Sequence, residues 1–484
     1  MLSPSPLQAQ ALAGLQRYWG YRQFRPLQGE IVAALLQQQD VLALLPTGAG
    51  KSLCFQLPAL LQPGLSLVVS PLVALMENQV EALQAKQVPA ALFHSEQPRE
   101  HRQSTLRQLE AGQLKLLYLS PESLLSPAIW PRLEQVAANI QSLVVDEAHC
   151  ITQWGSNFRP VYRRLGTIRS ALKGHPGPMA IAAFTATADV TTQQDIQKVL
   201  GLQNPQIFRS SPYRKNLFLR IERVCTLASR RDRLRTFLRA QGQTTGLVYT
   251  RSRRDSEEMA AWLQQQGYRT AAYHAGLSAP ERRRIEQQWL SGQLPFVLCT
   301  SAFGMGVDKP DVRWVCHFHP PLSLSEYLQE IGRAGRDGNS AQTLLLASEP
   351  TGLLDPTDKQ RQNGFMEKLR SQTQLAHRLA QTLPQEGNLP DLLQRNPQAE
   401  LALAVLHQQG QLRWVDPFRY RLIAQPAIRD RQKATDPTTV IAAYFATRRC
   451  RWQFLLDAFG FMREAQGLVC GHCDRCCKRP SAAP

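Results

Sequence analysis

The stretch Leu-Pro-Thr-Gly-Ala-Gly-Lys-Ser at residues 45–52 decides the fold, because it follows an apolar run and has the composition of a phosphate-binding loop. Small residues at its centre let backbone N–H groups close around phosphate oxygens. Lys51 adds a positive charge for the β- and γ-phosphates, and the Ser52 hydroxyl is suited to bind Mg²⁺. The candidate nucleotide-binding residues here are Thr47, Gly48, Ala49, Gly50, Lys51 and Ser52.

A second stretch, Val-Val-Asp-Glu-Ala-His at residues 144–149, closes an apolar run that begins at Ser142. Asp146 at a strand tip suits the Mg²⁺ shell, and Glu147 is placed to orient and deprotonate an attacking water. Either stretch alone has a chance explanation. The two together, in this order, predict a protein that binds and hydrolyses ATP.

The composition is that of a globular protein with a polyanionic partner. The chain has 484 residues, of which 43% are hydrophobic and 19% charged. This length is enough for about three or four domains. A net charge of +18 favours a nucleic acid as partner. From charge alone, a merely basic protein without such a partner is the alternative.

No targeting or membrane segment is expected. No apolar run reaches the ~18 residues of a membrane span. Residues 1–6 are not a basic region followed by an apolar one, so no signal peptide is predicted. We therefore expect a cytoplasmic protein, nucleoid-associated if the source is bacterial. Of ten cysteines, four crowd into residues 470–477, which in a reducing cytosol indicates metal binding.

Two α/β units follow one another along the chain. Apolar runs that alternate with helical stretches predict buried parallel strands. The runs are residues 41–45, 65–70, 115–120, 142–145 and 179–185, then 246–250, 270–274, 296–300, 314–318 and 343–347. Capping boxes at Ser278 with Glu281 and at Ser323 with Glu326 predict helix starts. The expected fold class is α/β, with two tandem doubly wound parallel-sheet domains at residues 1–206 and 207–349.

Ligands of open parallel sheets bind at the carboxyl ends of the strands. Residues 47–52, 146–149 and 185–187 each follow a predicted strand. We therefore expect these three segments to share one edge of the first sheet, next to a cleft between the two domains.

The alternation of apolar runs and helical stretches ends past Glu349. Residues 358–383 predict a polar helix and 384–400 a linker, so 350–400 is assigned as a helical linker region. Residues 401–426 predict a helix plus a hairpin, 427–439 a charged linker, and 440–479 a helical metal-binding platform. A disordered tail is expected at 480–484.

These motifs together resemble the RecQ family of DNA helicases over about residues 20–347 and 450–476. The Pro-Thr-Gly-x-Gly-Lys-Ser form, with Leu45 in place of the early glycine of a strict P-loop, is typical of superfamily 2 helicases, as is Asp-Glu-Ala-His. The resembling segments are Phe-Arg-Pro-Leu-Gln at 24–28, Asp-Glu-Ala-His-Cys-Ile-Thr-Gln-Trp-Gly-Ser-Asn-Phe-Arg-Pro at 146–160, Phe-Thr-Ala-Thr at 184–187, Tyr-His-Ala-Gly-Leu at 273–277, Cys-Thr-Ser-Ala-Phe-Gly-Met-Gly-Val-Asp-Lys-Pro at 299–310 and Gln-Glu-Ile-Gly-Arg-Ala-Gly-Arg-Asp-Gly at 329–338. The resemblance implies RecA-like motor domains that use ATP and Mg²⁺.

The Phe-Arg-Pro-Leu-Gln motif corresponds to the part of the family that reads adenine. Tyr21 can stack on a purine, and the Gln28 amide can pair with the adenine edge as donor and acceptor. Arg25 is assigned to the same site. The alternative is that Tyr21, Trp19 and Phe24 are core aromatics of an N-terminal helix.

Arg333 and Arg336 lie three residues apart, and we expect them to project from nearly one face of a helix. By family correspondence, Arg336 is the arginine finger for the γ-phosphate and Arg333 its phosphate-binding neighbour. The alternative is a solvated basic helix end. Flanking glycines at 332, 335 and 338 favour close backbone approach to a ligand.

Trp154, Phe158 and Arg159 follow the Asp-Glu-Ala-His box closely. Aromatic stacking with a guanidinium on a phosphate is a common way to hold single strands, so these residues are expected to bind DNA and couple it to hydrolysis. The alternative is ordinary packing of a turn. The family usually has His-Asp where this chain has Ser156 and Asn157.

Cys450, Cys470, Cys473 and Cys476 have the spacing of four thiolates around a tetrahedral Zn²⁺. The surrounding residues resemble the zinc-binding helical platform of the family. His472 and Cys477 are spare ligand candidates, and a redox Cys-x-x-Cys is the weaker alternative.

The C-terminal region departs from the family, in which the zinc platform follows the second motor domain almost directly. Here about a hundred residues separate Ala347 from Cys450. Within them, residues 401–426 predict a relocated wing-like element with Trp414, Phe418 and Tyr420 facing DNA. The alternative is a spacer that packs on the zinc platform.

We therefore predict an ATP-dependent DNA helicase of RecQ type. The resemblance implies 3′→5′ travel and unwinding of tailed or forked duplex DNA in recombination, repair and replication. It also implies single-stranded DNA and its junctions with duplex, a single-strand-binding protein and recombination factors as partners. Two alternatives stay open: an RNA helicase of the same superfamily, and a DNA-binding or annealing protein with a weak motor.

Overall fold

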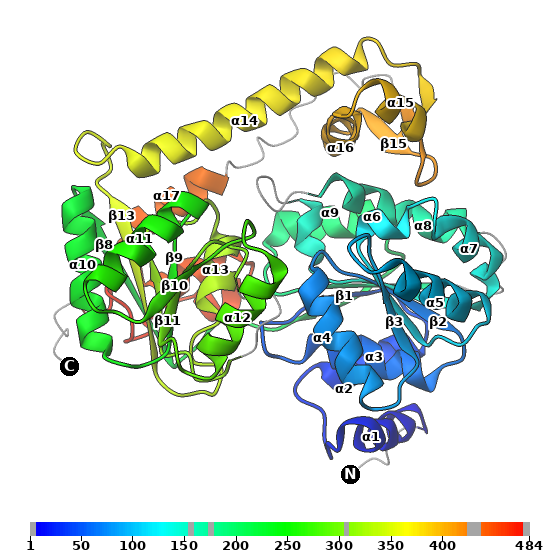
Figure 1. Ribbon diagram of the computed structural model, residues 1–484, viewed down its shortest axis with the longest axis horizontal. Coiled ribbons are helices and arrows are strands. Elements are labelled where there is room, and N and C mark those ends of the chain that lie inside the picture. Colours follow the sequence, from blue (N-terminus) through cyan, green and yellow to red (C-terminus); the bar gives the residue numbers. More distant parts are fainter. Residues whose placement is uncertain (1–5, 153–158, 173–178, 304–308, 424–436, 478–484) are drawn as a thin grey trace. The chain divides into compact units, whose positions relative to one another are not determined.

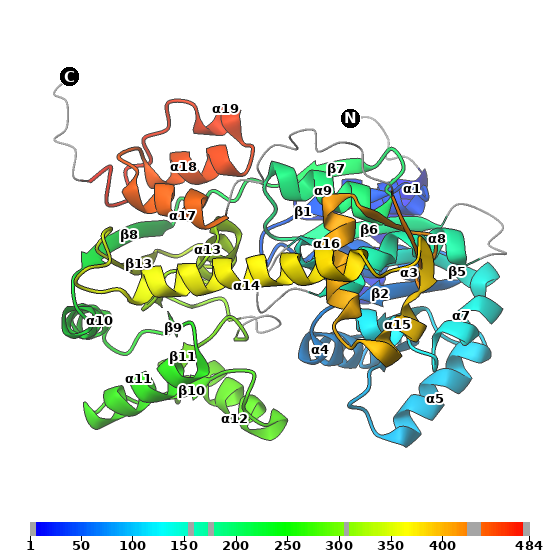
Figure 2. The same cartoon turned by 90° about the horizontal axis from the view of Figure 1, so that it is seen from above.

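The computed structural model describes residues 6–152, 159–172, 179–303, 309–423 and 437–477. The chain forms two compact units, which we describe separately (Figures 1 and 2). Unit 1 comprises Met1–Ser210 and Glu367–Arg429, and unit 2 comprises Ser211–Met366 and Asp430–Pro484. None of the helices in the described ranges is long and apolar enough to span a membrane.

Unit 1 is built on a parallel sheet whose described strands have the order β3–β4–β2–β5–β6–β1–β7. These strands are β1 (Val41–Leu44), β2 (Leu65–Val69), β3 (Ala90–Phe93), β4 (Leu116–Leu119), β5 (Ile140–Val145), β6 (Ala180–Thr185) and β7 (Gln206–Arg209). The five predicted strands are confirmed, and β3 and β7 are added at the two edges of the sheet. Strands β5, β6 and β1, which carry the candidate motifs, are neighbours.

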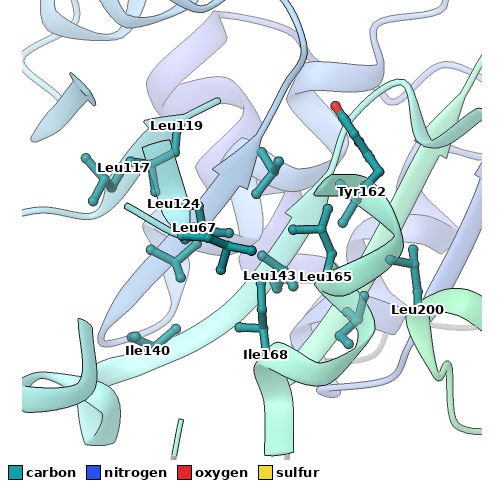
Figure 3. Close-up of a cluster of buried hydrophobic side chains, with 14 of the residues drawn as sticks. Leu67, Leu117, Leu119, Leu124, Ile140, Leu143, Tyr162, Leu165, Ile168 and Leu200 are labelled. Carbon is teal, nitrogen blue, oxygen red and sulfur yellow. The ribbon is translucent and has the colours of Figure 1, made fainter. Parts of the chain in front are cut away.

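Alternate residues of these strands pack into two hydrophobic cores, one on each face of the sheet. Leu42 and Leu44 enter one core, and Val41 and Ala43 enter the other. Figure 3 shows the first core, in which Leu67, Leu117 and Leu143 of three strands meet. The covering helices are α1 (Pro6–Trp19), α2 (Gln28–Leu36), α3 (Lys51–Leu61), α4 (Val73–Gln84), α5 (Arg99–Glu110), α6 (Pro121–Leu124), α7 (Trp130–Gln135), α8 (Ile168–Ala171) and α9 (Val190–Leu200), with the 3₁₀ helices η1 (Ala137–Asn139), η2 (Ala148–Ile151) and η3 (Pro160–Thr167).

Unit 2 contains a second parallel sheet, whose described strands have the order β10–β11–β9–β12–β13–β8. They are β8 (Leu217–Val224), β9 (Gly246–Tyr249), β10 (Thr270–Tyr273), β11 (Phe296–Cys299), β12 (Trp314–His317) and β13 (Ala341–Ser348). The helices of this sheet are α10 (Leu227–Gln241), α11 (Arg253–Gln265), α12 (Ala279–Leu290) and α13 (Leu324–Ile331). The prediction of two α/β units is confirmed, and edge strand β8 is an addition to it.

The predicted capping boxes are formed to different extents. The Ser278 hydroxyl accepts from the Glu281 N–H, and the Glu281 carboxylate accepts from the Ser278 N–H, so the box at α12 is complete. Ser323 caps α13 by accepting from the Glu326 backbone. The Glu326 carboxylate instead accepts from the Leu322 N–H, 3.0 Å away.

A small folded module follows the long helix α14 (Thr357–Ala380; yellow in Figure 1). It contains β14 (Glu386–Asn388), α15 (Leu389–Arg395), α16 (Ala399–Gln409), β15 (Leu412–Trp414) and β16 (Arg419–Leu422), and we call residues 386–422 the accessory module. The helix and hairpin expected at 401–426 are confirmed up to Leu422. The linker expected at 384–400 is wrong, because it holds the third strand of the module's sheet and helix α15. The linker expected at 427–439 lies mostly outside the described residues.

Both interpretations of the hairpin need correction. Trp414 and Tyr420 are buried in the module's own cluster, so they do not face DNA as a wing would require. Phe418 packs against Trp130 of α7, with ring centroids 5.4 Å apart. The module therefore packs on the sheet domain of unit 1. The alternative, a spacer packed on the zinc platform, is also wrong for these aromatic residues.

The cysteine-bearing segment packs on unit 2 through α17 (Pro437–Ala446), α18 (Arg451–Ala458) and α19 (Met462–Ala465), coloured red-orange in Figure 2. Trp452 and Tyr444 are fully buried and share a core with Leu217 and Leu219 of β8. Backbone bonds from Leu219 N to His472 O and from Asp474 N to Leu219 O, 3.3 and 2.9 Å long, tie the segment to this edge strand. We call residues 437–477 the cysteine module.

Candidate active site and metal centre

The phosphate-binding loop and the Asp-Glu-Ala-His box meet at the carboxyl edge of the first sheet. Lys51, the first residue of α3, places its Nζ 3.3 Å from Oε1 of Glu147, which follows β5. Nδ1 of His149 lies 2.9 Å from Oγ1 of Thr185, the last residue of β6. The prediction that the three motif segments share one edge is confirmed.

The loop has the backbone that its glycines predict. Gly48 and Gly50 have φ angles of 83° and 76°, in the left-handed region that glycine adopts without a steric penalty. A Cβ atom on Gly50 would lie 2.6 Å from Nε2 of Gln28. Residue 50 therefore needs glycine both for its backbone angle and for the close approach of a neighbouring side chain.

The predicted adenine-reading residues lie against this loop. Gln28 donates from Nε2 to the Ala49 carbonyl over 2.9 Å, and its Oε1 accepts from the Arg25 N–H over 3.0 Å. Arg25 in turn donates from Nη1 to the Gly48 carbonyl over 2.8 Å. The motif is thus connected directly to the phosphate-binding backbone, a link that sequence reasoning did not foresee.

The aromatic residues at and before this motif differ in exposure, so some fit stacking on a base and others fit the alternative of core packing. Tyr21 is 55% exposed, so the core alternative is wrong for it and its ring is available for stacking. Trp19 and Phe24 pack against the cluster formed by α1, α2 and α3, as the core alternative expects.

Glu147 is held in an unusual backbone conformation. Its φ and ψ angles are both 47°, which is left-handed and rare for a residue other than glycine. Such conformations cost about 1–3 kcal/mol and often occur at functional sites. The angle turns the chain sharply after β5, so Glu147 faces Lys51 on one side and His149, 3.1 Å from its Oε2, on the other.

The two carboxyl groups have opposite pKa shifts. Burial raises the pKa of Asp146 to about 6, although the Lys51 charge opposes this shift. Burial also acts to raise the pKa of Glu147, but the Lys51 charge and the His149 contact outweigh it and lower the pKa below its usual range. Glu147 is therefore ionised at neutral pH and able to accept a hydrogen bond.

The segment Gln-Glu-Ile-Gly-Arg-Ala-Gly-Arg-Asp-Gly at residues 329–338, which we call motif VI, differs from the helix expected for Arg333 and Arg336. Helix α13 ends at Ile331, and a turn with Gly335 at a φ angle of 59° follows it. The two arginines therefore do not share a helix face. The glycines at 332 and 335 were the sequence signal for this break. Arg333 is buried and Arg336 is half-buried, with its Nε donating to the Gly332 carbonyl over 3.4 Å.

A buried ion network that sequence reasoning missed supports motif VI in unit 2. Arg251 donates to both carboxylate oxygens of Glu330, over 2.9 and 2.8 Å, and to Glu326 over 2.8 Å. His317 lies 2.8 Å from the same Glu330 carboxylate. Because Glu330 is the second residue of the motif VI sequence, this network fixes the end of α13 from which the turn starts.

The predicted DNA-coupling residues are only partly described. Trp154 and Phe158, with Ser156 and Asn157, lie outside the described residues. Arg159 is half-buried and donates to Glu122 over 2.9 Å and to the Pro71 carbonyl over 2.8 Å. Burial would lower the pKa of Arg159, but the Glu122 carboxylate outweighs it and the pKa is raised, so the guanidinium stays charged.

The four predicted zinc ligands come together. The sulfur atoms of Cys450, Cys470, Cys473 and Cys476 all lie within 4.8 Å of one another. Four thiolates at such separations fit a tetrahedral Zn²⁺, and no other donor is needed. His472 has both ring nitrogens engaged, with Tyr213 and with the Leu217 carbonyl, each at 3.0 Å. His472 and the exposed Cys477 therefore stay outside the cluster.

The cysteine module is also held by a buried ion pair. Arg451, next to Cys450, is 1% exposed and donates to both oxygens of Asp474 over 2.8 and 3.0 Å. It also donates to the Tyr444 carbonyl. Because Asp474 lies between two of the cysteines, this pair links the helical and the loop halves of the cluster.

The chain matches two family models that lie in the order of the two units. A DEAD/DEAH box helicase model matches residues 25–196, and a helicase conserved C-terminal domain model matches residues 229–338. The ATP-dependent DNA helicase RecQ of a Synechocystis species is 48% identical over 467 residues, which is 96% of this chain and 97% of that protein. The chain belongs to the RecQ family of ATP-dependent DNA helicases. The RecQ helicase of Haemophilus influenzae is 41% identical over 69% of this chain and 53% of that protein.

Solved structures show the same fold at low sequence identity. Mycobacterium smegmatis helicase Lhr bound to single-stranded DNA and AMP-PNP has a TM-score of 0.55 and 20% identity, covering 75% of this chain and 50% of that one. S. cerevisiae Dbp5 bound to RNA and ADP BeF3 has a TM-score of 0.55 and 16% identity, covering 75% of this chain and 91% of that one. These matches support two RecA-like domains and confirm the predicted fold class.

The Synechocystis match extends over 96% of this chain, so it is not confined to the residues that the two family models match. The family membership also decides between the functions left open by the sequence. It supports a DNA helicase, and supports neither the RNA helicase nor the annealing protein.

Proposed function

We propose that this RecQ-family chain is an ATP-dependent DNA helicase that couples ATP hydrolysis at the first sheet to unwinding of duplex DNA. The observation that carries the ATPase assignment is the 3.3 Å contact between Lys51 and Glu147 at the carboxyl edge of the sheet. Family membership supports DNA as the substrate, and the net charge of +18 is consistent with a polyanion.

Residues of unit 1 carry the hydrolysis. Lys51 binds the β- and γ-phosphates together with the N–H groups of residues 47–50, and Ser52 and Asp146 would hold Mg²⁺. The metal, when bound, neutralises phosphate charge in the transition state. Glu147, ionised and held by its backbone turn, orients the water and takes its proton. Since Lys51 and Glu147 contact each other, their contact must open for both roles to be performed.

The residues that contact the nucleotide base and the γ-phosphate are assigned by family correspondence. Tyr21 is proposed to stack on adenine, and Gln28 and Arg25 to recognise the edge of the base. The hydrogen bonds of Gln28 to Ala49 and of Arg25 to Gly48 connect this recognition to the phosphate-binding loop. Arg336 is the proposed arginine finger and Arg333 its phosphate-binding neighbour.

DNA contact is assigned to Trp154, Phe158 and Arg159, which follow the Asp-Glu-Ala-His box in sequence. Their aromatic and cationic side chains suit a single strand. Arg159 is held by Glu122, so its participation requires that this ion pair opens or is shared with a phosphate.

The four clustered cysteines are proposed to hold one structural Zn²⁺. Their position on edge strand β8 supports a role in folding, because the ion would hold the cysteine module against the second sheet. A redox role for the Cys-x-x-Cys pairs has no support in the surrounding fold.

The finer properties follow the family resemblance. We propose 3′→5′ travel on tailed or forked duplexes during recombination, repair and replication. Single-stranded DNA and its duplex junctions would be the substrates, and a single-strand-binding protein and recombination factors the partners. A cytoplasmic location, at the nucleoid in a bacterium, agrees with this role.

The site assignment is tested with Glu147→Gln and Lys51→Ala. The first variant keeps the cation that binds phosphate but loses the base, so it should bind ATP and fail to turn it over. The second loses the cation and should bind ATP weakly. Glu110→Gln, on an exposed carboxylate paired with Arg132, is the matched control and should behave as wild type. Near-normal turnover in Glu147→Gln would refute the role of this residue.

A further inference from the structure

Three consecutive residues of η3 join the accessory module to the Asp-Glu-Ala-His box. The first is Tyr162, whose ring is fully buried among the leucines of the first core, as Figure 3 shows. Its hydroxyl points away from these side chains and donates to the backbone carbonyl of Asp146 over 3.3 Å. Tyr162 therefore touches the box at the residue just before Glu147.

The second residue, Arg163, contacts both partners. It is 4% exposed, and its Nη1 donates over 3.0 Å to the carbonyl of Ile151, the last residue of the 3₁₀ helix η2 that follows Glu147. Its Nε donates over 3.3 Å to Nδ1 of His407, on helix α16 of the accessory module. One guanidinium thus bridges the box segment and the module.

The third residue, Arg164, is directed to the module. It forms a close ion pair with Glu400 at the start of α16 and donates from Nη1 to the Pro417 carbonyl in the hairpin over 3.0 Å. Its guanidinium carbon lies 5.8 Å from the centre of the Trp414 ring. Arg164 is 7% exposed, so its charge depends on Glu400 for compensation.

These contacts surround the catalytic carboxylate without including it. The carbonyls of Asp146 and Ile151, which η3 holds, flank the strained turn at Glu147 and the His149 side chain next to it. Neither Arg163 nor Arg164 contacts the phosphate-binding loop among the bonds described for them. A change in how the module docks would therefore reach the box directly, and the nucleotide-binding loop only through the contact between Glu147 and Lys51.

We propose that Tyr162, Arg163 and Arg164 are positioning residues through which the accessory module sets the geometry of the Asp-Glu-Ala-His box. Docking of the module then controls the turnover of ATP without contact to the nucleotide. The inference rests on the proposed ATPase function. It adds a role for a module that the motor motifs do not include.

The test breaks and then restores the ion pair between the module and η3. Glu400→Arg places two cations together, and the double variant Glu400→Arg with Arg164→Glu restores opposite charges. Glu400→Gln removes the charge without changing the size of the side chain, and it replaces Glu400→Arg in the test if that variant folds poorly. Glu110→Arg is the control, because it reverses an exposed carboxylate of unit 1 that pairs with Arg132.

The readouts are kcat and KM for ATP at saturating single-stranded DNA, with hydrogen exchange of residues 386–422 as a measure of docking. We expect kcat to fall about 3- to 30-fold in Glu400→Arg, the range typical of residues that link two sites, with KM for ATP unchanged. The double variant should recover most of the lost kcat. Glu400→Gln should fall between wild type and Glu400→Arg.

Two results would overturn the inference. One is an unchanged kcat in a Glu400 variant whose module exchanges faster than in wild type. The other is a fall of kcat and a rise of KM together with no recovery in the double variant, which indicates general damage to the unit. A wild type that fails to hydrolyse ATP would instead refute the proposed function on which the inference rests.

Discussion

Replacing Trp414 with alanine should unfold the accessory module and leave both parallel sheets intact. The Trp414 side chain is 8% exposed and packs with Leu403, Leu412 and Tyr420. Removing a buried tryptophan costs about 3–5 kcal/mol. Its indole N–H has no hydrogen-bond partner among the described residues, so the loss comes from packing. A segment as short as 386–422 has only about 2–6 kcal/mol of stability of its own, which the substitution would consume.

Hydrogen exchange read by mass spectrometry separates local from global effects. Peptides from residues 386–422 should lose protection in Trp414→Ala, while peptides from β1, β5, β9 and β12 keep it. Val415→Ala is the control, because this neighbouring side chain is 39% exposed and should change little. If residues 386–422 stay protected while unwinding of a tailed duplex is lost, Trp414 acts on DNA and the buried assignment is refuted.

Gly50→Ala should weaken ATP binding, because it strains a backbone with a φ angle of 76° and meets Gln28. Gly292→Ala, with a similar φ angle of 78° and open space around it, is the control for nucleotide titration. Cys473→Ser should lower bound zinc and the melting temperature, whereas Cys477→Ser should keep both, and retained zinc in Cys473→Ser would contradict the ligand set. Burial and the neighbouring charge of Arg163 lower the pKa of His407 to about 3. In the unfolded chain the histidine has a pKa near 6.5, so the unfolded state binds the proton at a higher pH than the folded state does. The free energy of unfolding therefore decreases as the pH falls below 6.5, by about 1 kcal/mol at pH 5.5. Denaturation at pH 7.5 and 5.5 should show a loss of stability that is larger in wild type than in His407→Gln by about this amount.

The sequence was most informative where burial is continuous. Strands such as β1 and β5 are apolar along their whole length because both faces of a parallel sheet are covered, and this pattern is visible without a structure. Strand β8 was missed because it is an edge strand with Arg220, Glu222 and Arg223 in its sequence. Polar β7, with exposed residues at most positions, was missed for the same reason.

The candidate site was predictable where one short motif carries the chemistry. The loop around Lys51 and the box at Glu147 are each recognisable from a few consecutive residues, and the parallel sheet brings the two into contact. The expected helix does not continue to Arg333, because Gly332 and Gly335 are poor helix formers and α13 ends at Ile331. The pair of Arg164 and Glu400, 236 residues apart in sequence, depends on tertiary packing that no local pattern encodes.

Strand displacement with matched tailed duplexes of DNA and RNA, in the presence of ATP and Mg²⁺, tests the proposed helicase activity directly. We predict that wild type unwinds DNA with a 3′ tail, that it leaves the RNA duplex and the 5′-tailed DNA intact, and that Glu147→Gln unwinds none of them. Displacement of the RNA duplex in preference to DNA, or ATP-dependent unwinding by Glu147→Gln, would contradict a DNA helicase driven by hydrolysis at Glu147.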